Sequence, residues 1–304
     1  MRGNLAFALR GVGTAVGATF ALREVSFELP TGYVMGLIGA NGAGKTTTIR
    51  CLLGICPIRT GEIELLGHPV PGPVELRQDV GVVLDHGYLV GDWRLTEVER
   101  ALRPFYDRWD GERFRRLLDE FGLDPRAKVK DLSRGMSMKL TIAVALSHRA
   151  RLLVFDEPTS GLDPVARDEL LGIIGDFLLD DGHSVLFSTH ITTDLDRVGD
   201  YLTLIHDGRI VATGTKDDVL DAYRVVRAGP DDDLGGVRLI GARRTATGTQ
   251  ALVRTEEAGL FGDRFLVEAP TLEEIAVHIG TRAPGPAQRH RPQPDSSMST
   301  RGNS

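Results

Sequence analysis

One eight-residue stretch, GANGAGKT from Gly39 to Thr46, limits the folds open to this chain more than any other part of the sequence. It matches the phosphate-loop pattern G-x-x-x-x-G-K-[ST] at every fixed position. The apolar run YVMGLI precedes it and TTTIRCLLG follows it, which predicts a buried strand leading into a helix. Backbone N–H groups and the positive end of the helix dipole then face an anion. The stretch therefore predicts an α/β fold that binds a nucleoside triphosphate.

Individual residues of this stretch have defined chemical roles. Lys45 is expected to reach the β- and γ-phosphates, and the Thr46 hydroxyl to bind Mg²⁺. The residues predicted here to bind the nucleotide are Gly39, Asn41, Gly42, Ala43, Gly44, Lys45, Thr46 and Thr47. The alternative interpretation is a glycine turn between a strand and a helix that holds no ligand.

Charge and hydropathy exclude several classes of protein. The 304-residue chain has a net charge of −6 and a pI near 5.8, whereas a general nucleic-acid-binding protein normally has a basic face. We therefore expect no nucleic-acid partner. No apolar run approaches the ~18 to 20 residues of a membrane-spanning helix. The start, MRGNLAFALRG, lacks the long apolar segment of a signal peptide, so a cytoplasmic protein is expected.

Two later segments supply candidate catalytic groups. In RLLVFDEPTSGLDP, an apolar strand places Asp156 at its end, where a carboxylate can hold the water shell of Mg²⁺. Glu157 would lie beyond the γ-phosphate and act on water as a general base. SVLFSTH ends in His190, which could hydrogen-bond the γ-phosphate. The predicted catalytic residues are Lys45, Glu157 and His190. In isolation the acidic pair would be a solvated turn and His190 a strand end, but their order behind a phosphate loop favours catalysis.

A second anion site is predicted between the phosphate loop and the acidic strand. The segment LSRGMSMKL places Ser133 as a helix N-cap. Gly135 leaves the backbone N–H groups of the first helical turn uncovered. Alone, Ser133 would be an ordinary helix cap.

Together these motifs resemble those of the nucleotide-binding subunits of ATP-binding-cassette (ABC) transporters, over roughly residues 5 to 220. LSRGM stands where that family has its LSGGQ signature, SGLD matches the D-loop, and His190 matches the switch histidine. The resemblance implies that two such subunits, identical or paralogous, enclose two ATP molecules head to tail. Ser133 and Gly135 of one subunit would then contact the γ-phosphate held by Lys45 of the other.

The chain departs from the family pattern at three places. Asp85 follows the GVV strand where the family has a glutamine near Mg²⁺. A carboxylate is also a good ligand for this cation, so the predicted metal ligands are Thr46, Asp85 and Asp156; the alternative is that Asp85 caps the next turn. Arg134 and Met136 replace the usual glycine and glutamine of the signature. Val16 stands where an aromatic residue generally stacks on adenine, which predicts weak discrimination between bases.

The signature and Asp85 also resemble a branch of small ATPases that pair with separately encoded, polytopic ABC-2-type membrane subunits in Gram-positive bacteria. This resemblance implies an ATPase that drives an exporter from the inner face of the cell membrane. The predicted divisions are a nucleotide-binding domain over 1–224, with a helical subdomain over about 86–147, a C-terminal module over 225–280 and a disordered tail over 281–304. The alternatives are an ABC ATPase acting on ribosomes or DNA, and a catalytically weak regulatory module.

Local patterns predict three details of the fold. Apolar and polar residues alternate from about Asn4 to Pro30, which indicates antiparallel strands. The segment TEVE, from Thr96 to Glu99, fits a capping box at the start of a helix. Asp207 and Gly208 fit the turn of a strand hairpin.

Overall fold

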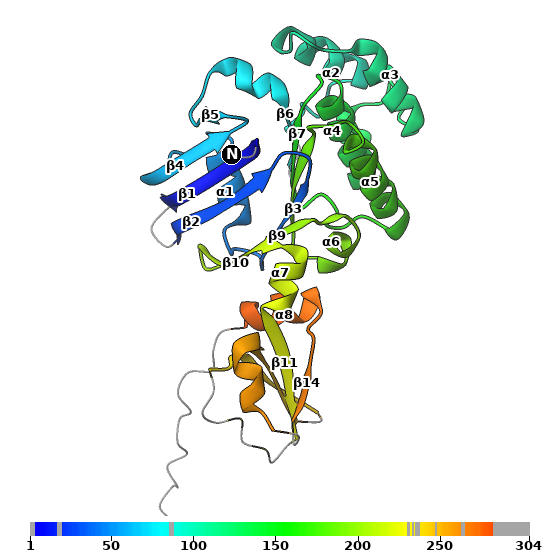
Figure 1. Cartoon of the computed structure of the whole chain (residues 1–304). Helices are drawn as coiled ribbons and strands as arrows, with labels where there is room; N and C mark the ends of the chain where they lie inside the picture. Colours follow the sequence, from blue (N-terminus) through cyan, green and yellow to red (C-terminus); the bar gives the residue numbers. More distant parts are fainter. Residues whose placement is uncertain are drawn as a thin grey trace, which may run out of the picture.

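The computed structural model describes residues 4–16, 20–84, 88–229, 232, 234, 238–246, 248–262 and 265–281. Three sheets organise these residues. In Figure 1 the blue antiparallel sheet stands beside the central sheet, and the third sheet lies below both. The arrangement confirms the predicted α/β fold: a phosphate-loop core with an antiparallel β subdomain, a helical subdomain and a small C-terminal α/β extension.

The central sheet brings three strand ends to one edge. Its order is β10-β9-β3-β8-β7-β6; the pairings from β9 to β6 are parallel, and β10 runs antiparallel to β9. The strands are β3 (Val34–Ile38), β6 (Val80–Val83), β7 (Leu152–Asp156), β8 (Ser184–Thr189), β9 (Tyr201–His206) and β10 (Arg209–Thr215). Every residue of β3, β7 and β8 is buried, as expected for parallel strands covered on both faces. The loops after these three strands therefore meet.

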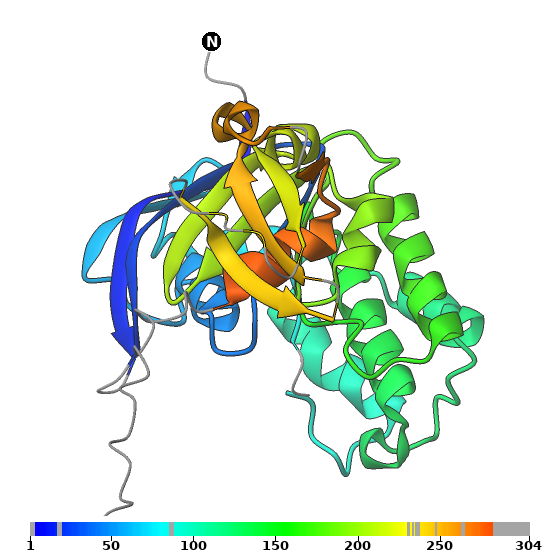
Figure 2. The same ribbon diagram turned by 90° about the horizontal axis from the view of Figure 1, so that it is seen from below.

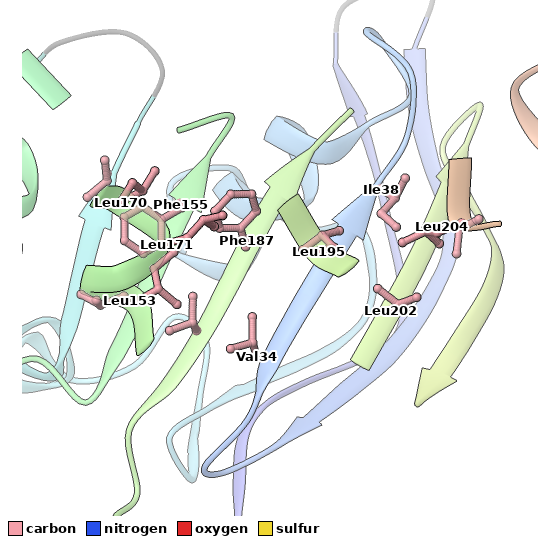
Figure 3. Packing of buried hydrophobic residues seen from close by; sticks show 14 of the residues in the cluster. Val34, Ile38, Leu153, Phe155, Leu170, Leu171, Phe187, Leu195, Leu202 and Leu204 are labelled. Carbon is pink, nitrogen blue, oxygen red and sulfur yellow. The ribbon is translucent and has the colours of Figure 1, made fainter. Parts of the chain in front are cut away.

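Helices cover the central sheet. They are α1 (Lys45–Leu52), α4 (Arg134–Leu146), α5 (Pro164–Phe177) and α6 (Thr192–Val198). Figure 3 shows Leu171 of α5 beside Phe155 and Phe187, whose ring centroids lie 6.1 Å apart. Burial of such a side chain stabilises the fold by about 1.5–3 kcal/mol. None of the described helices has the length and apolar character needed to cross a membrane.

The N-terminal sheet packs against the outer face of α1. It has the order β2-β1-β4-β5, with strands β1 (Leu5–Val16), β2 (Phe20–Pro30), β4 (Thr60–Leu65) and β5 (His68–Pro69). Its pairings are antiparallel, which confirms the antiparallel strands predicted from about Asn4 to Pro30 for the described residues of that range. Phe7 and Phe27 make an edge-to-face contact in its core, and Ile49 of α1 belongs to the same buried cluster.

A helical section follows β6. It contains the short 3-10 turns η1 (Val74–Asp79), η2 (Arg103–Phe105) and η3 (Val129–Asp131) and the helices α2 (Leu95–Leu102) and α3 (Gly111–Glu120). The predicted capping box at Thr96 is wrong, because α2 begins at the fully buried Leu95. The carboxylate of Glu97 instead accepts the backbone N–H of Arg94 at 2.7 Å. Burial of Leu95 therefore sets the start of this helix.

A third sheet and a last helix form the C-terminal module. After α7 (Lys216–Asp221) come β11 (Tyr223–Ala228), β12 (Ile240–Thr245), β13 (Gly248–Arg254), η4 (Thr255–Leu260), β14 (Leu266–Glu268) and α8 (Leu272–Gly280). The sheet order is β12-β13-β11-β14. Figure 2 shows α8, in orange-red, between these strands and the green helices. Ile275 of α8 shares a buried cluster with Leu195 of α6. The predicted tail lies, apart from Thr281, outside the described residues.

The hairpin between β9 and β10 contacts the phosphate loop. Its turn lies at Asp207 and Gly208, as the sequence predicts. The two residues have φ angles of 46° and 71°, as a two-residue hairpin turn requires. The Gly208 N–H donates to the carbonyl oxygen of Ala43 at 2.9 Å, and its own carbonyl accepts from Arg23 N–H at 2.8 Å. One turn residue thus joins the phosphate loop to the N-terminal sheet.

Replacing Gly208 with alanine should destabilise the protein more than replacing Gly122. Both glycines have positive φ, 71° and 66°, so each substitution costs about 1–2 kcal/mol of conformational energy. A Cβ at Gly208 would also overlap the Ala21 carbonyl oxygen, whereas one at Gly122 meets nothing within 4 Å. Urea unfolding should therefore show a loss for Gly208→Ala larger by about 2 kcal/mol. Equal losses would mean that the close approach of Gly208 to Ala21 adds nothing to stability.

Candidate nucleotide-hydrolysing site

The phosphate loop joins the end of β3 to the start of α1. Gly42 and Gly44 have φ angles of 82° and 120°, which a residue with a side chain rarely adopts. Gly44 is the N-cap of α1 and offers no side-chain cap, so the N–H groups of the first turn stay open to an anion. Asn41 is exposed, whereas Ala43 is buried. The backbone therefore has the form of an anion cradle.

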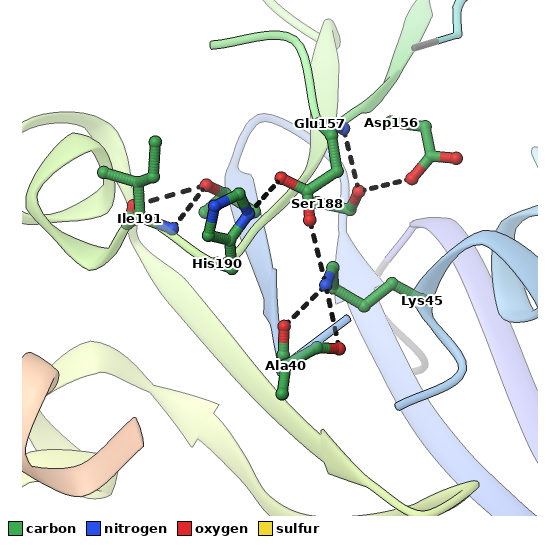
Figure 4. A network of polar contacts seen from close by, with 9 residues as sticks. Ala40, Lys45, Asp156, Glu157, Ser188, His190 and Ile191 are labelled. Atoms are coloured by element: carbon green, nitrogen blue, oxygen red, sulfur yellow. Dashed lines mark hydrogen bonds and ion pairs between the residues drawn. The ribbon is translucent and has the colours of Figure 1, made fainter. Parts of the chain in front are cut away.

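Lys45 is buried within this loop. Its side chain is 5% exposed, and its Nζ donates to the carbonyl oxygens of Gly39 at 2.5 Å and Ala40 at 3.3 Å. Nζ also lies 2.9 Å from Oε1 of Glu157, as Figure 4 shows. A buried ammonium needs such compensation. The loop thus holds one positive charge at its centre.

Glu157 connects Lys45 with His190. It follows β7 with a φ of 53°, and this left-handed conformation turns its carboxylate away from the strand direction. Its Oε2 lies 2.7 Å from Nδ1 of His190, and its side chain is only 12% exposed. The structure thus brings together the three residues that the sequence predicts to be catalytic, although they come from three separate segments.

Ser188 is a site residue that sequence reasoning missed. Its hydroxyl donates to Oδ1 of Asp156 at 2.7 Å and accepts the backbone N–H of Glu157 at 3.1 Å. Ser188 is fully buried and Asp156 is 4% exposed. A serine inside the apolar run SVLFST was the available signal, because a buried hydroxyl needs a hydrogen-bond partner. Ser188 therefore orients the Asp156 carboxylate and holds the backbone at Glu157.

The predicted metal ligands are partly described. Asp156 ends β7, Thr46 is half-buried in the first turn of α1, and Asp85 lies outside the described residues. No group of three or more His, Cys, Asp or Glu side chains among the described residues could hold a metal ion. One hydroxyl and one carboxylate fit Mg²⁺, which in nucleotide sites takes most other ligands from phosphate and water.

Ser133 and Gly135 belong to a separate surface. Ser133 is exposed and caps α4, accepting the N–H of Met136 at 3.3 Å, which confirms the predicted N-cap. A Cβ at Gly135 would lie 3.8 Å from the Leu162 side chain. The contacts of the described residues join neither Ser133 nor Gly135 to Lys45. Within one chain, the two predicted anion sites thus come from separate segments, the loop before α1 and the start of α4.

Ser133 and Gly135, at the start of α4, form what is called here the signature surface. The loop before α5 lies beside it. A Cβ at Gly161 would lie 3.1 Å from Nη1 of Arg134, so the signature arginine covers the loop. Asp163 caps α5, and its Oδ1 accepts the N–H groups of Val165 and Ala166, both at 3.0 Å. These hydrogen bonds, led by that of Ala166, hold the pKa of Asp163 below its usual value. The start of α4 and the start of α5 thus form one polar surface.

Val16, predicted to lie where an aromatic residue generally stacks on adenine, ends β1. In the strand register it pairs with Phe20, the first residue of β2. Phe20 is therefore the nearest aromatic residue across the hairpin in register, and the predicted weak discrimination between bases stays a prediction.

Known proteins have similar sequences and structures. The sequence profile described as "ABC transporter" matches residues 22–160. The chain is 36% identical over 220 residues to the Nod factor export ATP-binding protein I of Cupriavidus pinatubonensis (strain JMP 134 / LMG 1197), covering 70% of this chain and 67% of that protein. It is 32% identical over 309 residues to the protein of the same name from Sinorhizobium fredii (strain NBRC 101917 / NGR234), with coverages of 92% and 88%. A solved ATP-binding subunit of an ABC transporter has 30% identity and a TM-score of 0.63, covering 70% of this chain and 91% of that chain.

Replacing Ser188 with alanine should reduce ATP turnover by roughly 10–100-fold, the usual effect of removing a partner that orients a metal-binding carboxylate. Ser184 is the matched control. It lies on the same strand, is 1% exposed, and its hydroxyl accepts the N–H of Gly32 at 2.9 Å, far from the acidic pair. Steady-state phosphate release should therefore fall for Ser188→Ala and stay unchanged for Ser184→Ala. Equal turnover in the two variants would remove Ser188 from the site.

Proposed function

Because the chain belongs to the ABC transporter family of ATP-binding proteins, we propose that it is an ATPase subunit that dimerises head to tail and drives a separate membrane subunit of an exporter. The observation that carries this proposal is the Lys45–Glu157–His190 arrangement, with distances of 2.9 and 2.7 Å. A cation that can hold the phosphates and a carboxylate that can act on the attacking water are groups that hydrolysis of a γ-phosphate uses.

The hydrolytic step follows from these contacts. The γ-phosphate would take the Lys45 ammonium, which releases the Glu157 carboxylate to face the attacking water. As the water oxygen bonds to the γ-phosphorus, the bond to the β–γ bridging oxygen breaks, and the water proton passes to Glu157. His190 would hold both the γ-phosphate and the carboxylate in place. ADP and inorganic phosphate are the products.

We propose that Thr46 and Asp156 hold Mg²⁺, which when bound would neutralise charge on the β- and γ-phosphates. Asp85 is the third proposed ligand. The nucleotide itself would be held by the loop from Gly39 to Thr47.

A second subunit would complete each site. Ser133 and Gly135 come from a different segment than Lys45, so the positive end of the α4 dipole would be available to a phosphate held by another chain. The second subunit is either another copy of this chain or a paralogue. Each dimer would then contain two composite sites.

The proposed membrane partner would dock beside the helical section. An apolar cavity of about 340 Å³ opens between this section and the N-terminal sheet. Ile55 and Tyr88, which are 60% and 46% exposed, line it, and the buried His148 stacks on Tyr106 at its wall. Burial lowers the pKa of His148 and so favours its uncharged form. An apolar cytoplasmic segment of the partner fits such a cavity, and it would hold the ATPase at the inner face of the membrane.

We also propose a division of the chain into domains. Residues 1–224 would form the nucleotide-binding domain, with the helical subdomain at about 86–147, and residues 225–280 the C-terminal module. The third sheet starts with β11 at Tyr223, two residues before the proposed boundary.

Glu157→Gln should bind ATP but hydrolyse it roughly 10²–10⁴-fold more slowly, because the amide cannot accept the water proton. Closed dimers should then accumulate. Gel filtration with ATP and Mg²⁺ should show a dimer for Glu157→Gln and a monomer for Lys45→Ala, which lacks the phosphate contact. If Glu157→Gln retained near-normal turnover, or stayed monomeric with ATP bound, Glu157 would not be the base.

The role of Asp85 can be separated from that of the phosphate loop. If its carboxylate is a metal ligand, Asp85→Ala should raise the Mg²⁺ concentration for half-maximal turnover while ATP binding remains. Asp85→Gln should restore part of the metal response, because a side-chain carbonyl is also an oxygen ligand. Mg²⁺ is titrated at saturating ATP. An unchanged half-saturation in Asp85→Ala would show that Asp85 only caps the following turn.

A further inference from the structure

Two ion pairs join the helices α5 and α6. Arg167 of α5 faces Asp194 of α6, and Arg197 of α6 faces Asp168 of α5. Helix α5 starts directly after the loop beside the signature, and α6 starts two residues after His190. The contact between these helices therefore lies close in sequence to the loop that carries His190.

The two pairs differ in burial. Nη1 of Arg197 and Oδ1 of Asp168 lie 2.6 Å apart, with side chains 59% and 68% exposed. Asp194 is instead 2% exposed, and its Oδ1 lies 3.7 Å from Nε of Arg167. Neither Nε of Arg167 nor Oδ2 of Asp194 has a hydrogen-bond partner within the described part of the chain. An exposed pair contributes little to stability, whereas a buried carboxylate strongly constrains its surroundings.

The position of Asp194 links it to His190. Helix α6 has only seven residues, and Asp194 follows His190 by four. The next residue, Leu195, packs so closely on β3 that a Cβ at Gly36 would overlap its side chain. With Leu195 held against β3, the charge of Asp194 and its contact with Arg167 set how the start of α6 is oriented.

We propose that the Arg167–Asp194 pair positions α6 so that His190 stays within hydrogen-bond distance of Glu157. Arg167 and Asp194 are thus positioning residues for ATP hydrolysis. This inference rests on the proposed roles of His190 and Glu157. The buried carboxylate of Asp194, rather than the exposed ion pair between the same helices, maintains the contact between α5 and α6.

Asp194→Ala should reduce kcat by at least ~10-fold, because small displacements of a catalytic group have large kinetic effects. ATP affinity should stay within about twofold, since Lys45 and the loop glycines supply the phosphate contacts. Asp168→Ala removes the exposed pair from the same two helices and should leave kcat unchanged. Turnover and binding of a fluorescent ATP analogue are measured for full-length variants whose thermal unfolding shows them to be folded. If Asp194→Ala does not fold, Arg167→Lys is measured in its place.

Double variants separate positioning from general destabilisation. If Asp194 acts through His190, adding Asp194→Ala to His190→Ala should cause no further loss of kcat. Additive losses, or a kcat for Asp194→Ala within twofold of the parent protein, would overturn the inference. Unchanged turnover in His190→Ala alone would instead contradict the proposed role of His190. Failure of the positioning role of Asp194 and failure of the proposed role of His190 therefore give different results.

Discussion

The ion pair between Lys45 and Glu157 is the contact on which the rest of the site depends. Its 2.9 Å distance joins the phosphate loop after β3 to the residue after β7. Both side chains are largely buried, so each would carry a high desolvation cost without the other. A γ-phosphate offers the ammonium a stronger partner, and it would free the carboxylate for water. The same contact therefore stabilises the site and, in the proposed mechanism, would prepare its chemistry.

The fold makes this contact possible by bringing separate segments together. Parallel pairing of β3, β7 and β8 places their carboxyl ends at one edge of the sheet. The β9–β10 hairpin contacts the loop through the Gly208 N–H, and α6, which follows the His190 loop, packs on β3 through Leu195. Apolar packing sets the frame, and a few buried polar contacts orient the side chains that we propose to be catalytic.

Sequence patterns predicted the parts of the site that lie within single segments. The phosphate loop, the Ser133 cap and the hairpin at Gly208 each follow from a local pattern, and the structure has them. The contacts of Ser188 with Asp156, and of Arg167 with Asp194, join residues more than twenty positions apart, so no local pattern contains them. The start of α2 was misplaced for a related reason: burial of Leu95 against the rest of the helical section outweighed the capping pattern at Thr96.

The composite nature of the site can be tested by mixing two inactive variants. Lys45→Ala removes the phosphate contact but leaves the signature surface intact. Ser133→Glu places a negative charge on the signature surface but leaves the phosphate loop intact. If each site is built from two chains, the mixture should hydrolyse ATP, because mixed dimers contain one intact site, whereas each variant alone should not. A mixture as inactive as its separate components, with both variants folded and associated, would contradict the head-to-tail dimer.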